Sequence, residues 1–266
     1  MFIVKVPCIN GLGKTLGCEN AGNELLKVLR TIHTNEGGKI IDVDKLDLEE
    51  IHVDNSNLEE ANKLIYKNAF EAFEEKPRVV FLGGDHSISY SLTRAFFDSV
   101  QNKGKEPCLI VFDAHPDCMK PMKEPTHEEW LSKLIEDGFP PKNVLIVGLR
   151  NSWKEELNFI KEKGIRTISL NRFENNYQDT CDTIMEFALG KELYVSIDID
   201  VVDPAFAPAT GYPVSGGLSS RQLIYLIQRI NKIKTLKAVD IVEINPDKDE
   251  GGKTVNLGAK ILSELI

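Results

Sequence analysis

Six side chains of metal-ligand type follow three apolar stretches of the chain. The stretches contain VVFLG, LIVF and LYVSI, and the six residues are His86, Asp113, His115, Asp117, Asp198 and Asp200. Within the second and third groups, successive members are two residues apart, so extended backbone points them to the same side. A buried carboxylate without a partner is costly, and its pKa shifts until it is neutral or it pairs with a cation. The pattern therefore indicates a cation site.

The donor types and their number narrow the choice of cation. Carboxylate oxygens mixed with imidazole nitrogens suit Mn²⁺, Zn²⁺ or Fe²⁺ better than a thiolate site would. Six such donors are too many for one ion, and they suffice for two divalent ions about 3.5–4 Å apart with bridging carboxylates. A single aspartate at a strand end is more often a turn or helix cap, but six ligand-type residues with this spacing favour metal binding.

Three motifs resemble the signatures of the ureohydrolase (arginase/agmatinase) family: GGDHSISY, DAHPD and SIDIDVVDPAFAPATGYPVSGGLS. The resemblance extends from Val4 to the end of the chain, and the third motif is the most specific. The resemblance implies two Mn²⁺ ions per subunit with a bridging hydroxide. This hydroxide would attack a guanidinium carbon and release urea and an amine. The resemblance also implies that Asp113 and Asp198 bridge the ions, with His86 and Asp117 completing one position and His115 and Asp200 the other.

The same resemblance implies three catalytic residues, Asp117, His127 and Glu243. Asp117 would accept a hydrogen bond from the nucleophile. Glu243, in VDIVEINP, resembles the carboxylate that pairs with the guanidinium, because a carboxylate can accept two parallel N–H donors. His127 follows Asp117 by ten residues, like a family histidine that carries protons to the leaving amine, although THEEW replaces the usual His-Gly pair. In the plainer interpretation His127 is a first-turn helix residue and Glu243 a solvated strand end.

The sequence gives opposing signals about the end of the substrate that lies away from the guanidino group, its far end. Met119 stands where the well-known arginases have asparagine, and a thioether cannot make the directional hydrogen bond that recognises an α-carboxylate. Lys120 and Lys123 could attract a substrate carboxylate or repel a substrate amine. The nearby acidic residues Glu124, Glu128 and Glu129 could have the opposite effect and favour an amine. PATG and EINP look more arginase-like, so arginine is the preferred substrate and agmatine or other guanidino or formimino acids are the alternatives.

Two other classes of function deserve weight. Deacetylase-type amidohydrolases keep one zinc and fewer acidic ligands, so the full set of six argues against them. A catalytically silent, metal-binding regulatory homologue is the second alternative, and the unusual segment 118–130 motivates it. Cys118 lies inside this segment, but we expect its thiol to point away from the metals.

Composition excludes several classes of partner and site. The chain of 266 residues, 42% of them hydrophobic, fits one large α/β domain, and the resemblance implies a single ureohydrolase domain over 1–266. A net charge of −9 argues against nucleic acid, and no apolar run is long enough for a membrane span. Five scattered cysteines without a CxxC pair, and an N-terminus without signal-peptide features, predict a reduced cytoplasmic protein. The family resemblance implies a small guanidino substrate and a homo-oligomer, either a trimer or a hexamer.

Strand and helix patterns alternate along the chain, which predicts a three-layer α/β/α fold with a mainly parallel central sheet. A loop is expected at 10–17. The expected strands are 2–7, 39–43, 78–82, 108–113, 144–148, 166–170, 193–199 and 237–244. The expected helices are 22–33, 57–75, 87–101, 127–138, 154–163, 178–189, 219–231 and 252–266. Ligands of such sheets bind beyond the carboxyl ends of the strands, where the Asp and His residues fall.

Overall fold

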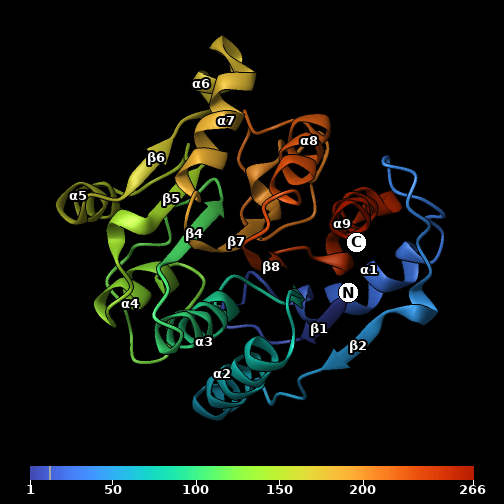
Figure 1. The fold of residues 1–266 in the computed structure, drawn as a ribbon, viewed down its shortest axis with the longest axis horizontal. Helices are drawn as coiled ribbons and strands as arrows, with labels where there is room; N and C mark the ends of the chain where they lie inside the picture. Colours follow the sequence, from blue (N-terminus) through green and yellow to red (C-terminus); the bar gives the residue numbers. More distant parts are fainter. Residues whose placement is uncertain (12) are drawn as a thin grey trace.

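A parallel sheet of eight strands runs through the molecule in the computed structural model, which describes residues 1–11 and 13–266 (Figure 1). The strand order is β2-β1-β3-β8-β7-β4-β5-β6, and every pair is parallel. The strands are β1 (Phe2–Val6), β2 (Asp47–Glu50), β3 (Val79–Gly83), β4 (Pro107–Phe112), β5 (Val144–Val147), β6 (Arg166–Ile168), β7 (Glu192–Asp198) and β8 (Leu236–Val242).

Helices cover both faces of the sheet, because alternate residues of each strand point to opposite sides. On β1, Ile3 packs into one core while Phe2 and Val4 pack into the other. The first core is closed by α1 (Ala21–Leu29), α6 (Leu170–Asn175), α7 (Tyr177–Phe187), α8 (Ser220–Ile230) and α9 (Lys253–Leu265). The second is closed by α2 (Leu58–Glu75), α3 (Ile88–Asn102), α4 (Trp130–Glu136) and α5 (Lys154–Lys163). The predicted three-layer α/β/α fold is confirmed.

One expected element was wrong, and two others have different bounds in the structure. The second strand is Asp47–Glu50 instead of 39–43, where Ile40 makes only an isolated bridge and is 75% exposed. As an edge strand, β2 carries mostly charged side chains, so apolar periodicity could not reveal it. Helix α4 begins at Trp130, not at 127, because Thr126 bonds the Glu129 carboxylate in a turn that precedes the helix. Strand β6 ends at Ile168, and residues expected at its end begin α6.

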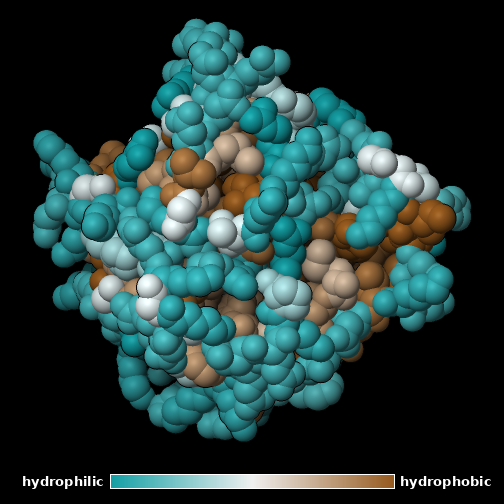
Figure 2. All heavy atoms as spheres, in the orientation of Figure 1, coloured by the Kyte–Doolittle hydropathy of each residue, from teal (hydrophilic) through white to brown (hydrophobic). Residues whose placement is uncertain are grey.

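Hydrophilic residues cover most of the face in Figure 2, with smaller apolar areas between them. None of the helices in 1–11 and 13–266 is long and apolar enough to cross a bilayer. The expected loop 10–17 includes Leu12, which lies outside the described residues.

Candidate metal centre and active-site cavity

The carboxyl ends of three central strands, β3, β4 and β7, lie at one edge of the sheet and carry the expected ligands. His86 follows β3, and Asp113 begins the loop after β4 that also holds His115 and Asp117. Asp198 is the last residue of β7, and Asp200 lies in the 3-10 turn that follows it. Strands β7 and β8 lie between β3 and β4, so residues far apart in sequence converge on one site.

A glycine controls how close β3 comes to the first loop. A Cβ atom on Gly84 would lie 1.9 Å from the carbonyl oxygen of Cys8, so a side chain there would force the backbone apart. Without that atom, the N–H of Asp85 donates to the same carbonyl at 3.2 Å. The buried Asp85 carboxylate in turn accepts from the N–H of Asn10 at 2.6 Å and from Thr15 Oγ1 at 2.8 Å. Asp85 therefore braces the loop beside His86, as a partner residue and not as a ligand.

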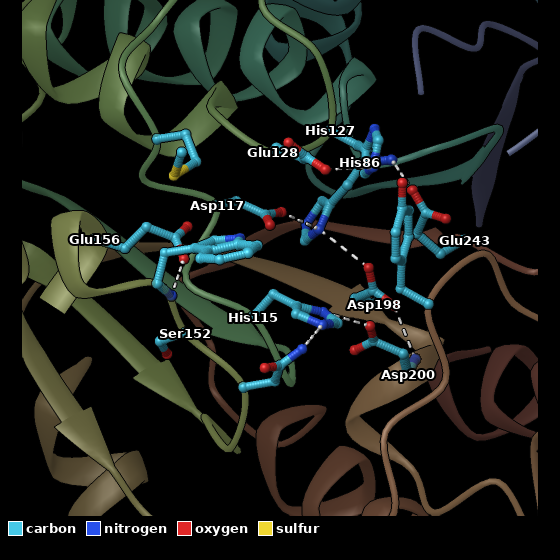
Figure 3. A pocket seen from close by; sticks show the side chains of 14 residues that line it. His86, His115, Asp117, His127, Glu128, Ser152, Glu156, Asp198, Asp200 and Glu243 are labelled. Carbon is cyan, nitrogen blue, oxygen red and sulfur yellow. Dashed lines mark hydrogen bonds and ion pairs between the residues drawn. The ribbon is translucent and has the colours of Figure 1, made fainter. Parts of the chain in front are cut away.

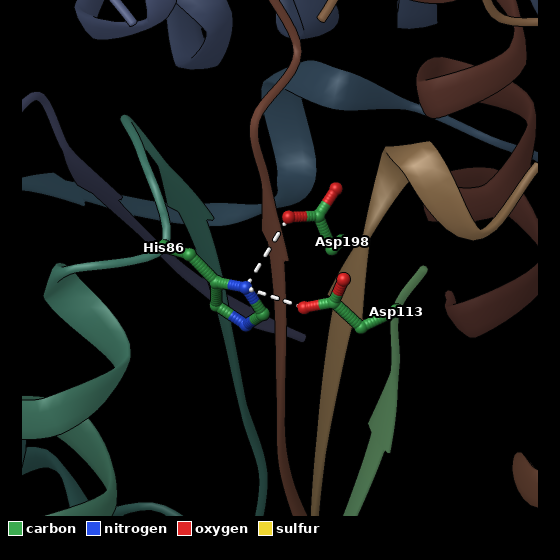
Figure 4. Close-up of side chains that lie close together, drawn as sticks. All are labelled: His86, Asp113 and Asp198. Carbon is green, nitrogen blue, oxygen red and sulfur yellow. Dashed lines mark ion pairs between the residues drawn. The ribbon is translucent and has the colours of Figure 1, made fainter. Parts of the chain in front are cut away.

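The first cluster surrounds one nitrogen of His86. Its Nδ1 lies 3.0 Å from Asp113 Oδ2, 3.0 Å from Asp117 Oδ2 and 3.2 Å from Asp198 Oδ2 (Figure 4 shows the first and third contacts). One nitrogen carries at most one proton and cannot donate to three carboxylates. Neighbouring donors on an octahedral ion with bonds of about 2.1 Å are about 3.0 Å apart. Each carboxylate oxygen therefore lies where a neighbouring donor on the same cation as His86 would lie, and the ligand atoms of His86, Asp113 and Asp198 are within reach of a single ion.

The second cluster lies on the other side of Asp113. His115 Nδ1 is 2.8 Å from Asp200 Oδ2 and 3.6 Å from Asp113 Oδ1. Asp113 thus turns one oxygen to each histidine, as a carboxylate shared by two cations would. Asp198 differs, because its Oδ1 accepts the N–H of Asp200 at 2.7 Å while its Oδ2 faces His86. The ligand atoms of Asp113, His115 and Asp200 also lie within reach of one ion, and of these three residues only His115 is partly exposed.

The protonation of these groups reflects the crowding of buried charges. Burial, followed by the charges of Asp200 and Asp113, raises the pKa of Asp198 well above its usual value. Burial and the charge of Asp113 raise the pKa of Asp117 to about 7. For His115, burial would lower the pKa, but hydrogen bonds and charges from Asp113 and Asp200 raise it to about 12. A divalent cation relieves such repulsion and replaces the imidazole proton on binding.

A chain of hydrogen bonds behind His86 sets its tautomer. His86 Nε2 lies 2.9 Å from Ser196 Oγ, whose hydroxyl donates to Asp240 Oδ1 at 2.6 Å. Since the only proton of Ser196 goes to the carboxylate, His86 Nε2 must be the donor, and the Nδ1 lone pair can face a cation. Asp240 is fully buried and also accepts from Ser89 Oγ at 2.7 Å and Tyr194 OH at 2.9 Å. Our sequence analysis missed Ser196 and Asp240, although an aspartate within the apolar β8 sequence was a usable signal.

A cavity of about 300 Å³ opens onto both clusters (Figure 3). Expected residues Asp117, Met119, His127 and Glu243 all line it. Glu243 Oε1 accepts the N–H of His86 at 2.9 Å, whereas its buried Oε2 and both ring nitrogens of buried His127 have no hydrogen-bond partner. The ring of His127 stacks on that of Tyr212, with centroids 5.2 Å apart.

Two cavity residues have unusual backbone conformations. Asp117 and Glu243 have φ angles of 49° and 63°, which L side chains rarely adopt. Among the described residues they are the only non-glycine residues with positive φ. Such strain accumulates where a structure fixes a side chain for function. The strain therefore marks the two carboxylates for which the resemblance implied a catalytic role.

Most of the charged residues that were expected near the far end of the substrate do not line the cavity. Lys123 Nζ pairs with Glu59 on α2 at 2.6 Å, and neither it nor Lys120 lines the cavity. Of the three nearby glutamates only Glu128 lines it. The sequence analysis also missed the rim residues Asn151, Trp153 and Tyr212, of which only Tyr212 lies in a recognised motif. The Cys118 thiol donates to the carbonyl of Pro116 at 3.0 Å and does not line the cavity, as expected.

Comparisons with known proteins agree with the fold and the ligand motifs. The arginase family model matches residues 1–266. An agmatinase from Bacillus subtilis is 31% identical over 191 residues, which cover 70% of this chain and 61% of that protein. A mitochondrial arginase 1 from Oryza sativa is 29% identical over 238 residues, which cover 87% of this chain and 67% of that protein.

A solved structure gives the same result. Proclavaminate amidino hydrolase from Streptomyces clavuligerus superposes with a TM-score of 0.89 at 25% identity, covering 99% of this chain and 89% of that one. The shared sheet and the whole-chain match of the family model agree with the three ligand motifs. The chain belongs to the arginase family.

Proposed function

We propose that this protein hydrolyses a guanidino group to urea and an amine at a centre that holds two Mn²⁺ ions. The observation that carries the proposal is the sharing of Asp113 between two histidine-centred clusters whose other residues line one cavity. His86, Asp113, Asp117 and Asp198 would hold one ion, and His115 and Asp200 with Asp113 the other. Two such ions supply hydroxide at neutral pH by lowering the pKa of bound water.

The protein's own side chains would bind and orient the substrate. The unpaired Oε2 of Glu243 can accept N–H donors of a guanidinium. Burial, followed by the charge of Asp85, raises the pKa of this carboxyl well above its usual value, and a cationic guanidinium beside it would favour the ionised form. Glu243 Oε1 is already bonded to the His86 N–H, so the carboxylate is held in one orientation. His127 has two free ring nitrogens and can deliver a proton to the leaving nitrogen.

The rim favours a particular substrate tail. Within the described part of the chain, no lysine or arginine lines the cavity, and Lys14 lies outside the lining, with its Nζ 5.9 Å from the centroid of the Tyr212 ring. The rim instead offers the Glu128 carboxylate together with Met119, Trp153 and Tyr212. We therefore propose a guanidino compound whose far end is an amine or an uncharged group, in preference to the arginine that the motif comparison favoured.

Three substrates of nearly equal length test this. Arginine carries both an amine and a carboxylate, agmatine only the amine and 4-guanidinobutyrate only the carboxylate. We expect urea release by the Mn²⁺-loaded protein to be fastest with agmatine and slowest with guanidinobutyrate, and to vanish in Asp198→Ala. Equal or faster turnover of the two carboxylates would refute the tail assignment. No urea from any of the three, with two metals bound, would refute the hydrolase.

A homo-oligomer, either a trimer or a hexamer, remains a prediction that light scattering would test.

A further inference from the structure

Asp117 is held from two directions by the first turn of α4. Its backbone lies in the left-handed region, and its carbonyl oxygen accepts the N–H of Leu131 at 3.2 Å. Its side chain is bonded by the indole of Trp130, whose Nε1–H donates to Asp117 Oδ2 at 2.8 Å. One short helix thus fixes both the strained backbone and the carboxylate of this residue.

The oxygen that Trp130 holds is the one aimed at the first cation position. Asp117 Oδ2 is the atom 3.0 Å from His86 Nδ1. The indole ring also packs against the His86 imidazole, with ring centroids 4.7 Å apart. Trp130 is completely buried, so no water competes for its N–H. An N–H donor that occupies one lone pair of a carboxylate oxygen leaves the other free for an ion and fixes its direction.

Trp130 also connects this ligand to the proposed proton carrier. It belongs to the segment Thr126–Trp130, in which Thr126 N donates to Glu129 Oε1 at 3.0 Å and closes a turn. His127 and Glu128 of this turn line the cavity, while Trp130 points to Asp117. A second tie runs from the N–H of Met119 to the Glu128 carbonyl at 3.1 Å. These contacts therefore fix the position of His127 relative to the loop that carries Asp117 and Met119.

We propose that Trp130 is a positioning residue that aims Asp117 Oδ2 at the first of the two cations. This inference rests on the proposed metal centre, and it concerns one cation position only. His115 and Asp200 make no hydrogen bond to Trp130, so the second position is independent of it.

The test is a divalent-metal titration of Trp130→Phe, which removes the N–H and keeps an aromatic ring. Mn²⁺ binding followed by electron paramagnetic resonance should show one ion bound 10–100-fold more weakly and the other unchanged, as expected for loss of a hydrogen bond to a metal ligand. The visible spectrum of the Co²⁺-loaded protein should change as well. With a turned-over substrate, kcat should fall more than KM rises.

Leu134→Ala is the matched control, since Leu134 is buried on the same helix and its side chain has no hydrogen-bond donor. It should lower thermal stability yet keep both Mn²⁺ affinities and the Co²⁺ spectrum. If Trp130→Phe fails to fold, benzothienylalanine at position 130 keeps the shape of the indole and removes only the N–H. Wild-type affinities and an unchanged Co²⁺ spectrum in the N–H-deficient protein would overturn the proposal.

The metal readout separates this proposal from the proposed activity. A weakened first ion in Trp130→Phe, in a protein that releases no urea from any guanidino compound, would support the role of Trp130 and refute the hydrolase. A wild-type protein that binds fewer than two divalent ions would overturn both.

Discussion

Replacing Ser196 with alanine tests whether the hydrogen-bond chain behind His86 prepares it for a cation. Ser196 Oγ accepts from His86 Nε2 and donates to Asp240 Oδ1, at 2.9 and 2.6 Å. The variant leaves a fully buried imidazole N–H without an acceptor and removes one of three donors from Asp240. A buried unsatisfied donor costs about 1–3 kcal/mol, and the lost bond to a charged group raises the expected total to about 2–4 kcal/mol.

The expected change in melting temperature follows from the chain length. Unfolding entropy is about 2.1 cal/mol/K per residue, so a chain of 266 residues has about 0.56 kcal/mol/K. A loss of about 2–4 kcal/mol therefore lowers the Tm of the metal-free protein by about 4–7 °C. Mn²⁺ should also bind about 10–100-fold more weakly at the His86 cluster, because the ring loses the partner that fixes its tautomer.

Ser89→Ala is the control that separates stability from metal binding. Ser89 donates to the same Asp240 carboxylate at 2.7 Å but leaves the bond between His86 and Ser196 intact. Both variants should lower the Tm in scanning calorimetry, and only Ser196→Ala should weaken Mn²⁺ binding. Equal Mn²⁺ affinities in the two variants would refute the view that Ser196 acts through His86.

Three further predictions concern the same edge of the sheet. The pKa of His115 is raised from its ordinary value to about 12, so Mn²⁺ must displace a proton from this residue when it binds at pH 8. The affinity for Mn²⁺ should therefore fall as the pH falls. A calorimetric binding enthalpy that does not depend on the buffer would contradict this, because it would mean that no proton is released. Gly84→Ala should destabilise the protein by about 3 kcal/mol, because its Cβ would overlap the Cys8 carbonyl, whereas exposed Gly37→Ala should change chemical denaturation little. Glu243→Gln keeps the shape of the side chain and removes its charge, so kcat/KM for the turned-over guanidino substrate should fall about 10–150-fold, equivalent to about 1.5–3 kcal/mol; an unchanged kcat/KM would exclude contact with the guanidinium.

The ligands could be predicted from the sequence because their signals are local. Asp113, His115 and Asp117 were found from their residue types near a strand end, and the structure gathers Asp113 and Asp117 with His86, and His115 with Asp113. The period-2 argument itself was wrong, because β4 ends at Phe112 and the three residues lie in a loop where Asp117 has a φ of 49°. The hydrogen-bond partners could not be predicted in this way. Ser196 and Asp240 are register partners on β7 and β8, so their contact depends on a strand pairing that neither segment encodes alone.

Errors in the elements have a similar physical origin. Strand β2 is formed by DLEE, whose charged side chains are tolerated because an edge strand faces solvent. The late start of α4 depends on Thr126 bonding Glu129 and on Trp130 bonding Asp117, a contact across 13 residues. Apolar periodicity reports burial against the sheet, but it carries no information on polar contacts between a loop and a helix.

The strand order explains why the site needs strands from distant parts of the chain. The chain leaves β3 and enters β4 three positions away, and the gap between them is filled only by β8 and β7 from the last third of the sequence. Asp198 and Glu243 therefore reach the centre between His86 and Asp113 only when those two strands have inserted. A cation held at the ends of β3, β4 and β7 spans this gap. Its binding free energy would thus stabilise the association of these central strands, because the ligands lie on three of them and β8 must lie between β3 and β7.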